Sequence, residues 1–134
     1  MIRVVLDTNV LVAALLSPNG TPARVLLIGI LEPDIHLCIS ATIFAEYEEV
    51  LRRPVFRIGD DQIYAALRSL RESSFWVKST QPVHACSDPD DDIFLDCAQA
   101  ADANYLVTGN KKHFPPVWRN TRIVTPREFL DDLG

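Results

Sequence analysis

Cysteine is scarce in this chain, and long apolar runs are absent. The three cysteines show no C-x-x-C spacing, so neither a disulfide framework nor a zinc knuckle is indicated. No apolar run approaches the ~18 residues of a membrane span. The N-terminal stretch reaches Asp7 without the uninterrupted apolar core and cleavage site of a signal peptide. We therefore expect a soluble, cytoplasmic protein that makes no membrane contact.

An excess of positive charge is also missing. The formal net charge is −5, which argues against a general nucleic-acid coat protein, because such proteins bind phosphates through a basic excess. A nuclease is not excluded, since acids gathered around metal ions also produce an acidic total. Local basic patches at 51–57 and 110–114 are still able to hold a nucleic-acid backbone. The 134 residues contain no repeat, low-complexity tract or linker, and we expect one domain over 1–134.

Short apolar strands alternate with helical patterns along the whole chain. Strands are predicted at 2–7, 35–40, 75–79, 104–110 and 121–126, and helices at 8–17, 21–33, 40–54, 61–74, from 88 onward and at 126–133. Such alternation predicts an α/β fold in which helices cover both faces of a parallel sheet. Ligands of these folds bind at the carboxyl ends of the strands. The residues to examine are therefore Asp7, Ser40 and 108–110.

The segment SDPDDDIFLDC (87–97) places four aspartates in five positions before an apolar stretch. Asp88 is expected to cap a helix whose first position is Pro89. At 100° per residue, Asp91 falls on the face that carries the apolar residues, with Asp90 and Asp92 on either side and Asp96 pointing away. An acid on a buried face needs a cation or donors. Asp91 is thus expected to face inward to a metal, and Asp92→Asn to have little effect.

Two further acids are aimed at the same edge of the sheet. Asp7 ends the first strand, although it is equally suited to cap the following helix. Glu46 lies about 60° from Ile43 on the helix at 40–54, whereas the two glutamates that follow it point away. Taken alone, Glu46 and Asp91 are each more simply an ordinary surface or first-turn acid. Together with Asp91 they form a set of hard oxygen ligands that suits Mg²⁺ or Mn²⁺, while His36, His84 and His113 share no zinc-ligand spacing.

Four motifs occur in the order and spacing of a PIN domain: VLDTNV, EYEEVL, DPDDDIFLDCA and YLVTGNKKHF. The chain resembles the single-domain bacterial and archaeal branch of that family, whose members are regarded as toxins of toxin-antitoxin pairs and are related to VapC-like ribonucleases. The resemblance implies a three-layer α/β/α sandwich with a five-stranded parallel sheet ordered 3-2-1-4-5. It also implies metal-dependent endoribonuclease cleavage of single-stranded RNA, leaving 5′-phosphate and 3′-hydroxyl ends.

Carried over residue by residue, the family's catalytic and metal-binding acids match Asp7, Glu46 and Asp91. Asn9 and Thr108 match polar positions that orient the metal shell. Asn110 stands where many relatives have a fourth aspartate, and its uncharged amide oxygen leaves open whether one or two ions bind. Candidates to hold the RNA backbone, or else ordinary solvated charges, are Arg52, Arg53, Arg57, Lys111 and Lys112. Trp76 and Trp118 are suited either to stack on bases or to pack in the core or an interface.

Two other classes of protein match the residues less well. A haloacid-dehalogenase-like phosphatase needs a second aspartate where Asn9 stands, and a receiver domain needs an aspartate at the end of the third strand, where FWVKS has none. The alternative is a PIN-fold module that is catalytically weak or inactive and acts by binding or dimerisation. The expected partners are single-stranded RNA, an antitoxin protein and a second copy of the chain in a homodimer, for which the helices at 22–31 and 61–72 offer apolar surfaces.

Overall fold

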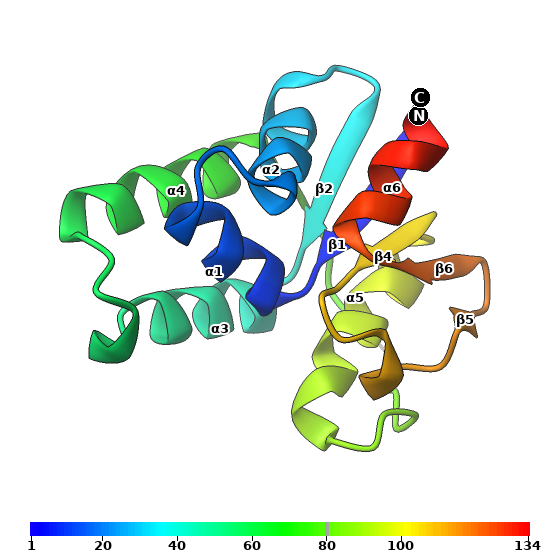
Figure 1. Ribbon diagram of the computed structural model, residues 1–134. Coiled ribbons are helices and arrows are strands. Elements are labelled where there is room, and N and C mark those ends of the chain that lie inside the picture. Colours follow the sequence, from blue (N-terminus) through cyan, green and yellow to red (C-terminus); the bar gives the residue numbers. More distant parts are fainter. Residues whose placement is uncertain (80) are drawn as a thin grey trace.

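A six-stranded, mostly parallel sheet forms the centre of the computed structural model, which describes residues 1–79 and 81–134 (Figure 1). Its order is β3-β2-β1-β4-β6-β5, and the strands are β1 (Ile2–Leu6), β2 (Ile35–Ile39), β3 (Phe75–Trp76), β4 (Tyr105–Val107), β5 (Val117–Trp118) and β6 (Thr121–Val124). The predicted α/β class is confirmed, and the expected fifth strand is β6. The difference is β5, a two-residue antiparallel strand that extends the edge beyond β6.

Helices lie on both sides of this sheet, as the class requires. They are α1 (Thr8–Leu16), α2 (Thr21–Leu31), α3 (Ala41–Leu51), α4 (Asp60–Ser73), α5 (Asp92–Ala101) and α6 (Pro126–Leu133). In Figure 1, α2 and α6 lie on one side of the strands and α5 on the other. No single helix of the described residues is long and apolar enough to cross a membrane; α1 and α2 reach that length and composition only as a pair bent by 107°.

The central strand β1 and its neighbour β4 end side by side at the carboxyl edge of the sheet. Val4, Val5 and Leu6 are almost completely buried, as expected for a strand covered on both faces. Leu6 pairs in register with Val107 of β4, and the Asp7 amide donates to the Val107 carbonyl at 2.9 Å. The residues that follow these two strands, Asp7 and Thr108, therefore lie side by side at the carboxyl edge.

The acidic segment begins differently from the predicted helix. Asp88 is the cap, and its carboxylate accepts from the Asp90 amide at 2.9 Å. The turn that it caps is a 3₁₀ turn, η2 (Pro89–Asp91), and α5 starts only at Asp92. A 3₁₀ turn advances about 120° per residue rather than 100°, so the helical geometry assumed for the first turn does not hold. The directions expected for the aspartates change accordingly.

Asp92 and Asp96 face a neighbouring loop, and the expectation that Asp92 is a flanking acid without a structural role was wrong. The Asp92 side chain is buried, and its Oδ1 accepts from the backbone amides of Ala85 at 3.1 Å and Cys86 at 2.8 Å. One turn later, Asp96 accepts from the backbone amide of Val83. Burial raises the pKa of Asp92, but the hydrogen bonds from Cys86 and Ala85 outweigh it, and the pKa lies below 3.8. The two carboxylates thus fasten loop 83–86 to α5.

Replacement of Asp92 by alanine is therefore expected to destabilise the fold. Two backbone amides lose their acceptor, which costs about 2 kcal/mol of unfolding free energy. Since the folded pKa is lowered, this contribution is complete above the ordinary value of 3.8 and is lost as the pH falls through the folded value. Urea unfolding at pH 7 and in acid measures both effects, with the exposed Asp90→Ala as the matched control. Equal unfolding midpoints for the two variants at pH 7 would contradict this role.

Candidate active site

Asp7 is a buried carboxylate at the carboxyl end of β1. Its exposed fraction is 7%, and the Thr108 hydroxyl donates to its Oδ2 at 2.7 Å. Burial raises the pKa of Asp7 above its ordinary value, while hydrogen bonds from Thr108 and from the backbone of Thr8 and Asn9 act in the opposite direction. The site therefore holds a charge that is only partly compensated by protein donors.

Glu46 comes to the same edge from α3. Ser40 caps this helix by accepting from the Ile43 amide at 3.2 Å, as its position after a strand indicates. The Thr8 hydroxyl donates to Glu46 Oε2 at 3.2 Å, and the next residue, Tyr47, donates its buried hydroxyl to the Leu6 carbonyl at 2.5 Å. These contacts fix Glu46 beside the residue that follows Asp7. The sequence did not identify Thr8 or Tyr47 as residues that position Glu46, although Thr8 adjoins Asp7.

Asp91 is the last residue of η2, and its side chain is 19% exposed. Burial, followed by the negative charges of Asp7 and Asp88, raises the pKa of Asp91 to about 6. Asp91 is also in contact with His113, whose Nδ1 lies 3.6 Å from Asp91 Oδ2. Asp91 therefore lies within the electrostatic influence of Asp7. Sequence reasoning did not connect His113 with this site, because the contact joins two loops 22 residues apart.

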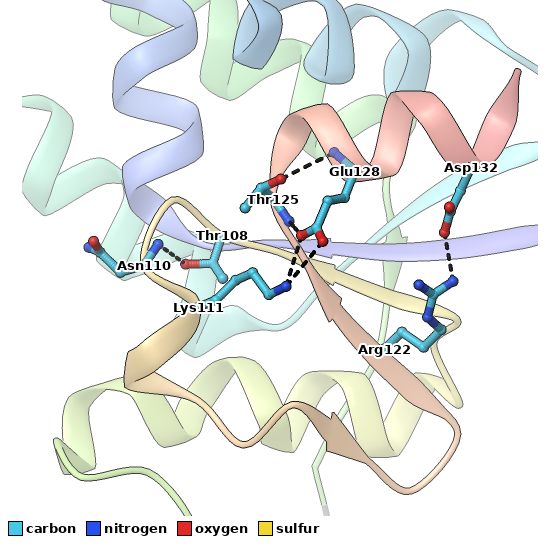
Figure 2. Close-up of polar contacts among 7 residues, drawn as sticks. All are labelled: Thr108, Asn110, Lys111, Arg122, Thr125, Glu128 and Asp132. Carbon is cyan, nitrogen blue, oxygen red and sulfur yellow. Dashed lines mark hydrogen bonds and ion pairs between the residues drawn. The ribbon is translucent and has the colours of Figure 1, made fainter.

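The three polar residues expected to support the site bind neighbouring groups of the chain. Thr108 links Asp7 to the loop after β4, since its hydroxyl oxygen also accepts from the Asn110 amide at 3.0 Å (Figure 2). Asn9 accepts from the Gly109 amide at 3.2 Å. The start of α1 and the end of β4 are thus joined through side chains as well as through the sheet. The Asn110 side chain is exposed at the surface of this loop.

The loop after β4 is also attached to α6. The Lys111 ammonium contacts both carboxylate oxygens of Glu128, at 3.0 and 3.1 Å (Figure 2). Glu128 belongs to a capping box with Thr125: the Thr125 amide donates to Glu128 Oε1 at 2.9 Å, and the Glu128 amide donates to Thr125 Oγ1 at 3.1 Å. The hydrogen bonds from Thr125, and then that from Lys111, lower the pKa of Glu128. Lys111 therefore has a structural partner.

The remaining basic candidates differ in how far their charge is neutralised. Arg52 pairs with Glu48 at 3.5 Å and Arg53 with Glu49 at 2.8 Å, both one helical turn apart on the exposed face of α3. Arg57 and Lys112 are exposed, and neither forms an ion pair with any residue of 1–79 or 81–134. These two are the better placed to meet an anionic backbone.

Both tryptophans are engaged in packing. Trp76 lies against Phe44, with ring centroids 5.5 Å apart, and its indole donates to the Arg71 carbonyl at 3.1 Å. The indole of Trp118 donates to the Gln99 side chain at 3.2 Å. These contacts agree with the packing alternative, and 42% of the Trp76 surface remains exposed.

The structure brings the three acids to one edge without closing them into a ligand cage. Within the described part of the chain, no three His, Cys, Asp or Glu side chains converge closely enough to hold a metal ion as they lie. Asp7 acts electrostatically on Asp91, and Glu46 is held through Thr8. The arrangement offers carboxylate oxygens at the carboxyl end of the sheet, which is the usual ligand position of such folds.

Comparisons with known proteins agree with this geometry. A family model described as the PIN domain matches residues 3–112. The chain is 29% identical to the uncharacterized protein MJ1680 of Methanocaldococcus jannaschii over 98% of this chain and 92% of that protein. It also superposes, with a TM-score of 0.57 and 17% identity, on a chain from the crystal structure of VapBC2 of Rickettsia felis bound to a DNA fragment from their promoter. That match covers 91% of this chain and 97% of the other.

The match to the family model covers well over half of the chain, and the superposition shows the same fold. PIN domains are generally metal-dependent nucleases. The resemblance seen in the four sequence motifs is confirmed: the chain belongs to the PIN domain family.

Proposed function

We propose that this chain is a Mg²⁺- or Mn²⁺-dependent endoribonuclease that hydrolyses phosphodiester bonds of single-stranded RNA. The observation that carries the proposal is the buried carboxylate of Asp7, whose charge helps to raise the pKa of Asp91 to about 6. A cation bound between the two carboxylates would offset the effect of the Asp7 charge on Asp91. Family membership supports the nuclease class.

The chemistry of the donors fits a hard divalent cation. Asp7, Glu46 and Asp91 offer carboxylate oxygens, the ligands that Mg²⁺ and Mn²⁺ prefer when they keep several waters. A cation bound there would supply an activated water and offset the charge that develops on a phosphoryl oxygen. Because the side chains do not converge as they lie, we propose that binding draws Asp91 and Glu46 toward Asp7.

The protein's own contribution is to hold these groups and to admit the substrate. Thr108 and Thr8 orient the carboxylates of Asp7 and Glu46 through their hydroxyls. Arg57 and Lys112 carry charges that contact RNA phosphates. Asn110 and Asn9 help to orient waters at the site.

We further propose that the protein is the toxin of a toxin-antitoxin pair and forms a homodimer. The support is the superposition on a chain of the VapBC2 structure of Rickettsia felis. Apolar side chains suited to partner proteins are exposed on α2 and α4, with Leu27 at 53%, Leu31 at 70% and Tyr64 at 64%. The competing function is a PIN-fold binding module without activity, favoured by the absence of a closed ligand cage among the described residues.

Substitution of either central acid is expected to abolish cleavage. Asp7→Asn and Asp91→Asn each remove a charge from the cation site, and we expect the rate of Mn²⁺-dependent cleavage of single-stranded RNA to fall at least about 100-fold (~2.7 kcal/mol). The exposed neighbour Asp90→Asn is the matched control and is expected to retain the wild-type rate. Cleavage measured by gel with a set of unstructured RNAs tests all four proteins side by side.

Thermal stability separates chemistry from unfolding in the same variants. Because burial raises the pKa of Asp7 and of Asp91, their charged forms oppose folding at neutral pH, and neither amide substitution is expected to lower the thermal midpoint. Undiminished cleavage by Asp7→Asn would disprove the assigned site. Absence of cleavage by the wild type on every substrate would favour the binding module.

Mn²⁺ itself is expected to stabilise the wild-type protein. An ion that binds only the folded state at about 100 times its dissociation constant adds about 2.7 kcal/mol, which is a shift of several degrees in a thermal melt. The shift is expected to vanish in Asp7→Asn and Asp91→Asn and to persist in Asp90→Asn. An equal shift in all four proteins would place the ion elsewhere.

Salt dependence distinguishes Lys112 from an arginine that is already paired. In the inactive Asp7→Asn background, Lys112→Gln is expected to reduce the slope of log affinity for RNA against log salt by about 0.7, the contribution of one single-strand phosphate contact. Arg53→Gln, whose charge is offset by Glu49, is expected to leave the slope nearly unchanged. Fluorescence anisotropy with a labelled RNA at several salt concentrations measures both slopes. Equal slopes for the two variants would remove Lys112 from the interface.

A further inference from the structure

The imidazole of His113 lies beside the acidic site. Its Nδ1 is 3.6 Å from Asp91 Oδ2, and its positive form lowers the pKa of both Asp91 and Asp7. The 3.6 Å separation is too long for a hydrogen bond. Half of the imidazole surface is exposed, so the ring is in contact with Asp91 without being part of the core.

The backbone and its anchors keep His113 in this place. It ends the 3₁₀ turn η3 (Lys111–His113), in which the His113 amide donates to the Asn110 carbonyl at 3.0 Å. The next residue, Phe114, is buried, and Lys111 on the other side is attached to Glu128 of α6. The turn is therefore fastened at both ends, and the imidazole between the two anchors is presented to Asp91.

The distance fits two ligands of one ion. Mg²⁺ and similar ions bind their ligands at about 2.0–2.1 Å, so two donor atoms on one ion can be up to about 4.2 Å apart. Asp91 Oδ2 and His113 Nδ1 fall within that reach as they lie. A neutral imidazole presents a lone pair on one ring nitrogen and is a common metal ligand.

We infer that His113 is a ligand of the catalytic cation, which it binds through Nδ1 together with Asp91. This inference rests on the proposed function, because it assigns one more ligand to the same ion. It has a consequence for metal preference: an imidazole favours transition metals such as Mn²⁺ over Mg²⁺, which prefers oxygen ligands alone. We therefore expect the chain to bind Mn²⁺ more tightly than Mg²⁺.

The test is cation binding by the full chain without RNA. Isothermal titration with Mn²⁺ and with Mg²⁺ compares the wild type with His113→Gln, His113→Asp and the control His36→Gln. His36 lies on β2, in register with Arg3 near the start of β1 and away from the carboxyl edge. We expect His113→Gln to weaken Mn²⁺ binding roughly tenfold or more and Mg²⁺ binding less. His113→Asp, which makes all the ligands oxygens, is expected to bind both ions and to lose the preference for Mn²⁺.

A spectroscopic signature separates ligation from a structural role. Electron spin-echo spectroscopy of the Mn²⁺-loaded wild type is expected to show modulation from a directly bound imidazole nitrogen, which is retained in His36→Gln and absent from both His113 variants. If Mn²⁺ binds in an Asp91-dependent manner but His113→Gln changes neither the affinity nor the spectrum, the inference is overturned and the proposed function stands. Lower RNA cleavage by His113→Gln with unchanged cation binding also overturns it, since His113 would then contact RNA. A wild type that binds neither ion overturns both proposals.

Discussion

The hydrogen bond between the Thr108 hydroxyl and the Asp7 carboxylate, 2.7 Å long and fully inside the protein, is the contact on which the functional edge depends. It joins the ends of two adjacent parallel strands at the level where their register places them side by side. An isolated buried carboxylate is expensive, and this donor together with nearby backbone amides makes it tolerable without neutralising it. A charge that is held but not cancelled is what a cation site requires. The rest of the edge is arranged around this residue.

The loop after β4 is attached to α1, to α6 and to the core. The Gly109 amide of this loop donates to Asn9 on α1, and Lys111 binds Glu128 on α6. Phe114 is buried in the core. Glu128 therefore has two roles: it caps the N-terminus of α6 together with Thr125, and it binds Lys111. Stabilising the last helix and positioning His113 beside Asp91 are consequences of one set of contacts.

Local patterns predicted those parts of the site that depend on regular geometry. Helical spacing correctly predicted that Glu46 points inward and that Glu48 and Glu49 point outward, because α3 is a regular helix that begins after its Ser40 cap. The same procedure failed at 88–92, where the chain forms a 3₁₀ turn before α5 and Asp92 is the buried acid. The partners of Asp92, Lys111 and His113 come from other loops, and no periodicity of the sequence encodes contacts between loops. The two-residue strand β5 is too short to produce a pattern.

The acidic segment shows how one short stretch serves stability and chemistry with the same residue type. Asp88 and Asp92 have backbone amides as partners, and the hydrogen bonds to Asp92 lower its pKa, so its charge favours the folded state. For Asp91, between them, the described part of the chain supplies no such amide donor, and burial together with the negative charges of Asp7 and Asp88 raises its pKa. Because its pKa is raised, the charge of Asp91 opposes folding at neutral pH. Asp91 and Asp92 thus have opposite effects on the stability of the fold. The hydrogen bonds of Asp88 and Asp92 hold the segment in place despite the unfavourable charge of Asp91. Acids whose carboxylates accept backbone hydrogen bonds therefore flank, and structurally support, the one acid in this segment whose charge is not compensated.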